Sequence, residues 1–220
     1  MTTRKRFTLV GLLALLGVGG LSACRSDGEI VVDQGVGITA VRSRCPAAGI
    51  PNYTGDVTLF RGSGAKIASN IDAVAVMTNV RVQCTEDSSR IFATSTFDVA
   101  VRRNDARGAR QITIPYFVSV LRGGSAVVSK RVGQVTINFN DGQVRSTANA
   151  QGSAYIDAAA ATLPEEIRER ITRKRRAGDS DAALDPMSDP EVKAALARAD
   201  FELLVGFQLD EDQLAYNATR

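Results

Sequence analysis

Residues 97–120 read FDVAVRRNDARGARQITIPYFVSV and contain the clearest periodicity in the chain. Phe97, Val99 and Val101 alternate with polar or small side chains, and a second alternating series runs over residues 112–120. A period of two residues places the apolar side chains of an extended segment on one face. The stretch therefore predicts two strands, each with one buried face.

Similar apolar runs recur on both sides of this stretch, near residues 38–43, 56–60, 73–84, 127–139 and 143–156. Arg-Gly-Gly-Ser at 122–125 and Asn-Asp-Gly-Gln at 140–143 contain residue types that accept positive φ in tight hairpin turns. We therefore expect the three strands around these turns to form an antiparallel meander. Successive short strands with little helix between them favour a mainly β protein, an antiparallel β-sandwich, over a parallel α/β sheet.

The periodicity changes after this series of strands. Thr162-Leu163-Pro164-Glu165 and Ser188-Asp189-Pro190-Glu191 both match the Ser/Thr-x-x-Glu capping box, with proline in the first turn, so each predicts the start of a helix. Alternation returns over residues 201–209 and predicts a final strand. We therefore expect a helical insertion over residues 163–199 of a single domain. Its narrow apolar stripes predict loose packing over one edge or end of a sheet.

The chain begins with the charge and hydrophobicity order of a secretory signal. Arg4, Lys5 and Arg6 form a positive segment, and an apolar segment follows over residues 7–21. This apolar segment is short for a membrane span, which needs roughly 20 apolar residues. Small residues and a cysteine close it, Leu21-Ser22-Ala23-Cys24.

That tetrapeptide resembles the lipobox of bacterial lipoproteins. In that family the cysteine thiol receives a diacylglyceryl group, the signal is cut before the cysteine, and the new amino group is often acylated. The resemblance implies a signal peptide over residues 1–23 and lipidation of Cys24. A polar tether over residues 24–35 and one domain over residues 36–220 would follow. Two or more acyl chains hold a protein stably at a bilayer.

The residue after the lipobox cysteine bears on location. In the lipoprotein family an aspartate at that position commonly retains the protein at the inner membrane, and this chain has Arg25. In a Gram-negative cell the resemblance therefore implies a lipid anchor in the inner leaflet of the outer membrane. The domain would face the periplasm.

Two cysteines, Cys45 and Cys84, remain after lipidation. In an exported protein an even pair predicts a disulfide, which would close a loop of about 40 residues and stabilise the fold by about 3 to 4 kcal/mol. A reactive or metal-binding thiol pair is the alternative, but neither a C-x-x-C spacing nor a histidine supports it. A disulfide between an early and a later strand suggests an immunoglobulin-like sandwich by analogy, without the tryptophan of antibody domains. A barrel is the alternative architecture.

Composition narrows the function classes. The chain has no histidine, which rules out Ser-His-Asp and Cys-His catalysis. Its 27 Lys and Arg residues include three in the signal, so 24 cations balance 24 Asp and Glu residues in the mature chain. No basic excess remains to favour a nucleic-acid partner. We expect no catalytic residues, no cofactor and no metal site.

Two charged segments of the insertion are candidate binding sites. We interpret Arg173-Lys174-Arg175-Arg176 as a solvated helix end, with contact to acidic lipid headgroups or an acidic partner as the alternative. The acidic residues that follow lack the central glycine and closing glutamate of an EF-hand, so we interpret them as a solvated loop rather than a calcium site. They are Asp179, Asp181, Asp185 and Asp189.

These observations predict a lipid-anchored envelope protein with a non-enzymatic binding or structural role and an envelope protein as partner. A hydrolase of envelope glycans or peptides that uses two carboxylates is one alternative. A carrier of a small ligand or lipid is the other. A deep cleft lined by convergent acidic groups would favour the hydrolase, whereas a flat or edge-strand surface would favour the binding protein.

The anchor is testable directly. Cys24→Ser removes the thiol that accepts the diacylglyceryl group, so we expect an uncleaved or soluble chain that takes up no labelled palmitate. Wild-type chain expressed in parallel is the control. Undiminished labelling of the Cys24→Ser chain would contradict lipidation at this residue.

Overall fold

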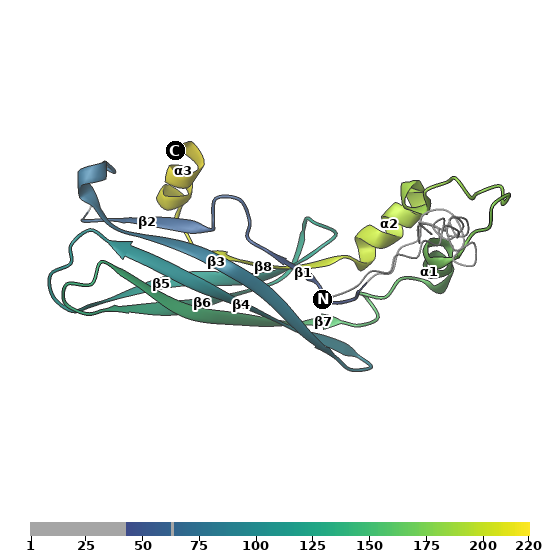
Figure 1. The fold of residues 1–220 in the computed structure, drawn as a ribbon, viewed down its shortest axis with the longest axis horizontal. Helices are drawn as coiled ribbons and strands as arrows, with labels where there is room; N and C mark the ends of the chain where they lie inside the picture. The colour runs from purple at the N-terminus through teal and green to yellow at the C-terminus, as the bar shows by residue number, and fades with distance from the viewer. Residues whose placement is uncertain (1–42, 63) are drawn as a thin grey trace, which may run out of the picture.

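A computed structural model describes residues 43–62 and 64–220. The expected signal peptide, Cys24, the predicted tether and most of the apolar run at 38–43 lie outside the described residues. The described part is mainly β and forms two four-stranded sheets, ordered β1-β8-β5-β6 and β2-β3-β4-β7 (Figure 1). The strands are β1 Ala47–Gly49, β2 Asp56–Phe60, β3 Ile71–Glu86, β4 Arg90–Arg103, β5 Arg110–Arg122, β6 Ala126–Phe139, β7 Arg145–Asp157 and β8 Phe201–Phe207.

The inner faces of the two sheets share one apolar core, as the alternation predicts. Buried side chains along β4 include Phe97, Val99 and Val101, and they pack with those of β5 and β8. All strand pairs in the described part are antiparallel except β1 with β8, which are parallel. The predicted antiparallel β-sandwich is therefore confirmed, and the barrel is not formed.

The predicted meander is half right. Strands β5 and β6 form the expected hairpin through the turn at 122–125, but β7 pairs with β4 in the other sheet along its whole length. The turn at 140–143 is thus a crossing between sheets. Ala148, Ala150 and Gly152 of β7 are small and face inward, so β7 packs closely against β5 of the other sheet. The sequence of the turn at 140–143 does not show which sheet the following strand will join.

Strand β3 changes the face it presents to the core in its middle. Ala73, Ala75 and Met77 point inward at odd positions, whereas Val80, Val82 and Cys84 pack against the core at even ones. The reversal lies at a bulge, where the register with β4 shifts between Thr78 and Arg81. One extra residue in a strand moves every later side chain to the opposite face.

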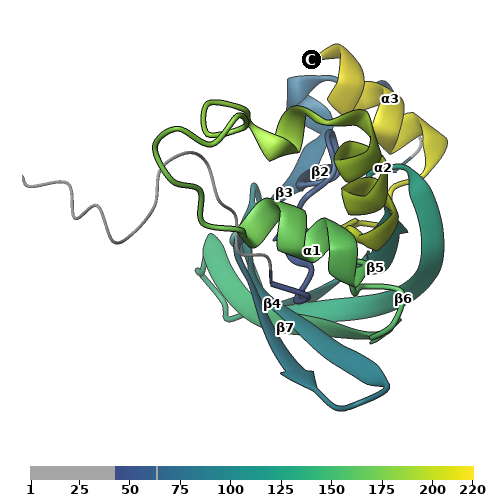
Figure 2. The same cartoon turned by 90° about the vertical axis from the view of Figure 1, so that its right-hand side faces the viewer.

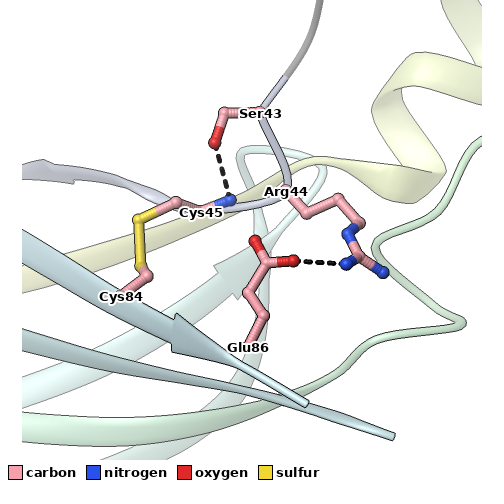
Figure 3. Close-up of a disulfide and its surroundings, with 5 residues drawn as sticks. All are labelled: Ser43, Arg44, Cys45, Cys84 and Glu86. Carbon is pink, nitrogen blue, oxygen red and sulfur yellow. Dashed lines mark hydrogen bonds and ion pairs between the residues drawn. A yellow bond between two sulfur atoms is a disulfide. The ribbon is translucent and has the colours of Figure 1, made fainter. Parts of the chain in front are cut away.

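The bulge therefore points Cys84 inward, and Cys45 and Cys84 are joined by a disulfide with their Cα atoms 5.9 Å apart (Figure 3). The bond links the segment that leads into β1 of one sheet to β3 of the other, as predicted. Arg44 forms an ion pair with Glu86 beside it (Figure 3). The disulfide and the ion pair thus hold residues 44 and 45 at the C-terminal end of β3.

The helical insertion lies at one end of the sandwich, and Figure 2 looks onto that end. It contains α1 (Glu165–Thr172), the one-turn helix η3 (Pro186–Ser188) and α2 (Pro190–Ala199). Ile167, Ile171 and Val192 form a small apolar cluster separate from the sandwich core. Arg122 Nε donates to the Arg198 carbonyl at 2.5 Å, which ties α2 to the β5–β6 hairpin.

The predicted capping boxes are wrong, although both helices begin within two residues of the expected positions. No side chain caps α1, because the Thr162 hydroxyl donates back to the Ala158 carbonyl. Asp189 rather than Ser188 caps α2, accepting from the backbone of the first turn. In both segments the hydroxyl donates to a backbone carbonyl earlier in the chain, Thr162 to Ala158 and Ser188 to Asp185, and this bond competes with capping.

A third helix, α3 (Glu211–Thr219), was not predicted, and it carries the capping box that the other two lack. Asp210 accepts from the backbone of Gln213, whose side chain accepts from the Asp210 N–H in return. Buried Asn217 donates to the carbonyls of Tyr53 and Asp56, each at 2.8 Å. These bonds dock α3 beside β2, away from α1 and α2 (Figure 1). The one-turn helix η2 (Ala68–Asn70) lies between β2 and β3.

A buried arginine closes the end of the sandwich where β6 passes to β7. Arg103, the last residue of β4, is 1% exposed, and its guanidinium lies 5.0 Å from the ring of Phe139. It donates at 2.7 to 2.9 Å to the carbonyls of Gln143, Gly108, Ala106 and Asn140. These bonds offset the desolvation of the charge and hold the loop after β4 against the crossing turn.

Arg103 should therefore be required for stability. Arg103→Met fills similar volume but leaves the four carbonyls without their donor, so we expect the free energy of unfolding to fall by about 3 kcal/mol in urea titrations. The neighbouring Arg102 is exposed and provides the matched control, Arg102→Met, with an expected change under about 0.5 kcal/mol. Equal losses in the two variants would contradict this role of the four hydrogen bonds from Arg103 to backbone carbonyls.

Candidate functional site: the overhanging half of strand β6

Strand β5 lies directly over β7 of the opposite sheet. A Cβ added to Gly152 of β7 would overlap the side chain of Val118 on β5. The Tyr116 hydroxyl donates to the Gln151 carbonyl at 2.8 Å, and burial raises the pKa of Tyr116. Because β5 faces this part of the edge strand β7, the first half of its neighbour β6 extends past the edge of the opposite sheet, whereas the second half of β6 contacts the start of β7 through the bond from Ser146 to the Asn138 carbonyl.

Burial along β6 shows where the overhang begins. Val135, Ile137 and Phe139 are buried in alternation, whereas every residue over 126–132 is exposed. Alternate residues of a strand point to opposite faces, so both faces of this half are open to solvent. We call residues 126–132 the β6 overhang.

The overhang is apolar for a solvated strand. Val127, Val128 and Val132 are 64%, 57% and 60% exposed and are among the most exposed large apolar side chains of the described residues. Single exposed apolar residues are ordinary, but three on one short strand segment form a local apolar surface.

The outer edge of the overhang carries unpaired backbone groups. β6 pairs with β5 on one side and with no strand of the described residues on the other. An edge strand presents a row of N–H and C=O groups that pair readily with another extended chain. The overhang therefore has both the backbone edge and the side-chain surface that strand addition uses.

Charge distinguishes this edge further. Lys130 and Arg131 lie within the overhang, and residues 126–134 contain no acidic side chain. Lys130 Nζ lies 4.9 Å from the centre of the Phe117 ring on β5, which places a cation over the outer face of this sheet. The edge is thus basic as well as apolar.

The charged residues of the insertion form local contacts. The interpretation of 173–176 as a solvated helix end is wrong for Arg175, which is 2% exposed and donates to Asp181 and to the Arg170 carbonyl. It is buried because α1 ends at Thr172 and the following chain folds back onto the helix. Arg173 also pairs with Asp181 rather than with a carboxylate of its own helix.

The four aspartates proposed as a solvated loop are likewise engaged locally. Asp185 and Asp189 accept from the first turns of η3 and α2, and Asp179 accepts from the Arg176 N–H at 2.9 Å. Within the described residues, no cluster of three or more His, Cys, Asp or Glu side chains is placed to hold a metal ion.

The β6 overhang was not identified as a site from the sequence. A signal was present, because period-two alternation holds at Val135, Ile137 and Phe139 but breaks over residues 127–132. A strand whose apolar residues do not alternate has no single buried face.

No protein-family model, curated protein or solved structure matches this chain. Over the described residues, no helix has the length and apolar character needed to cross a bilayer.

The overhang depends on the close approach of β5 to β7, and this approach is testable. Gly152→Ala introduces a methyl group where Val118 lies, so we expect a loss of about 1 to 3 kcal/mol in the free energy of unfolding. In the double variant Gly152→Ala with Val118→Ala, the smaller partner should relieve the overlap and make the combined loss smaller than the sum of the single losses. Strictly additive losses would contradict the contact.

Proposed function

We propose that this protein is a lipid-anchored component of the bacterial cell envelope that binds another envelope protein without catalysing a reaction. Cys24 would carry the lipid in the outer membrane, and the domain would face the periplasm. The observation that carries the binding role is the β6 overhang, an edge-strand surface of the kind that favours a binding protein over a hydrolase.

The attachment of the domain to its anchor supports this arrangement. Twenty residues separate Cys24 from Cys45, and a chain of that length spans at most about 70 Å when fully extended. When that segment is fully extended, a force on the N-terminus passes through the disulfide to β3 rather than to the short strand β1 (Figure 3). The domain would stay close to the bilayer with β6 accessible to neighbouring proteins.

The chemistry of the overhang indicates the kind of partner. An extended segment would pair its backbone with the outer edge of β6 and place side chains beside Val132 and beside Val128, the residue at which a bulge shifts the register with β5. Acidic side chains in that segment would complement Lys130 and Arg131. Pairing between two copies of this chain would instead bring the same cations together, which disfavours self-association.

The proposal is tested with the full chain in its native cells, carrying a photo-crosslinking residue in place of Val132. We expect a discrete protein adduct at this position. A crosslinker at Val76, which is exposed on the outer face of β3, should yield no such adduct and is the positional control.

Charge variants at Val128 sharpen the test. Val128→Glu and Val128→Lys are similarly polar, but only the glutamate repels an acidic segment, so the adduct at position 132 should fall several-fold more in the glutamate variant. Equal yields from positions 132 and 76, or an adduct that is a second copy of this chain, would overturn the proposed mode of binding.

A further inference from the structure

The bulge in β3 also builds a polar site on the outer face of its sheet. Asn79, at the bulge, has φ of 55°, a left-handed conformation that asparagine adopts more often than most residues other than glycine. Such conformations persist where the surrounding structure determines them, and they are frequent at binding sites. The bulge places the Asn79 side chain toward the neighbouring strand β4.

Asp98 of β4 receives that side chain and a second one from β7. Asn79 Nδ2 donates to Asp98 Oδ2 at 3.0 Å, and Asn149 Nδ2 donates to Asp98 Oδ1 at 2.5 Å. Arg81 Nε in turn donates to Asn79 Oδ1 at 2.9 Å. Three adjacent strands thus hold one carboxylate between two oriented amides.

A shallow hollow of about 350 Å³ lies at this network. Its lining residues come from β3, β4 and β7: Asn79, Thr96, Phe97, Asp98, Asn149, Ala150 and Gln151. The left-handed position at the bulge favours asparagine, but Asp98 and Asn149 lie in regular strands, where aspartate and asparagine are depleted, so strand formation does not explain their convergence. Local choices that oppose the fold are expected at functional sites.

The polar surface continues along β4 and β7 from the hollow. Thr96 lies opposite Gln151, and the Thr94 hydroxyl lies 2.9 Å from that of Ser153. The row ends at a pair of aromatic rings, Phe92 and Tyr155, with centroids 4.9 Å apart and Tyr155 59% exposed. Six residues of strand separate the two ends, about 20 Å. We call this row from Asp98 to Tyr155 the amide face.

We propose that the amide face binds a neutral glycan chain lying along β4 and β7. The amides and hydroxyls of this row both donate and accept hydrogen bonds, as sugar hydroxyls do. Asp98 accepts from the Asn79 and Asn149 amides and so orients both of them. The apolar face of a sugar ring would lie on Tyr155 at the end of the row. The length of the row suits an oligosaccharide rather than a single sugar.

Charge favours a neutral ligand over an anionic one. Asp98 lies in the hollow and would repel phosphate or carboxylate groups. Two cations lie beside the row, and both have partners: Arg81 donates to Asn79, and the Arg90 guanidinium lies 5.9 Å from the centre of the Tyr155 ring. Anionic polymers need several cations that neutralise the polymer charge, whereas most side chains of this row carry no charge.

The test uses the full chain purified in detergent and isothermal titration with neutral tetrasaccharides. The probes are β-1,4-linked N-acetylglucosamine, β-1,4-linked glucose and α-1,4-linked glucose, with heparin as the anionic comparison. We expect measurable affinity for at least one neutral probe. Tyr155→Ala and Asn79→Gly should weaken it by about tenfold. Asn79→Gly removes the amide and retains a residue that accepts positive φ.

Two variants serve as controls for fold and for location. Thr113→Ala lies on the outer face of the other sheet and should leave the affinity unchanged, as should Val128→Glu in the β6 overhang. Affinity for none of the neutral probes, affinity for heparin alone, or affinity that Tyr155→Ala and Asn79→Gly do not change would overturn the glycan site. These results do not depend on the protein partner of β6, because the titration contains no other protein.

Discussion

Strand β3 exchanges its two faces at Asn79, and both the closure of the sandwich and its outer surface depend on this exchange. Before the bulge Met77 points into the core, and after it Val82 and Cys84 do. Without the extra residue Cys84 would face solvent and the disulfide to Cys45 would not form. The same residue turns its own side chain toward Asp98. The extra residue at the bulge thus determines both which side chains of β3 enter the core and which polar side chain meets Asp98 on the outer face.

The two surfaces proposed to bind ligands arise from different constraints and lie on different sheets. The β6 overhang exists because β5, rather than residues 126–132 of β6, packs over the part of β7 around Gly152, an approach permitted by the absence of a side chain at that residue. The amide face exists because the bulge and the β4–β7 register align polar side chains on one outer face. A protein partner on an edge and a glycan on a face would not compete for the same atoms. An envelope protein that holds both would link a neighbouring protein to a polysaccharide.

Prediction from the sequence worked where a residue's environment depends on near neighbours in the chain. Alternation located the long strands, and the glycine-rich turn at 122–125 located the β5–β6 hairpin. The disulfide joins distant residues, and it was predicted because Cys45 and Cys84 are the two cysteines that remain once Cys24 is assigned to the lipid. Prediction failed where two segments compete for one position. The placement of β7 in the other sheet, the short parallel strand β1 and the burial of Arg103 under four carbonyls all result from contacts between distant segments.

The sequence by itself determined a mainly β domain with helices near its C-terminus, because hydrophobic period and turn chemistry are properties of short stretches. It also determined the resemblance of residues 21–24 to a lipobox, on which the proposed lipid anchor and location in the cell envelope rest. The tertiary structure alone decided which strand is left without an opposing sheet and which polar side chains meet at Asp98. Those outcomes depend on how closely two layers approach and on the register of strands far apart in the chain, and no local pattern records either quantity.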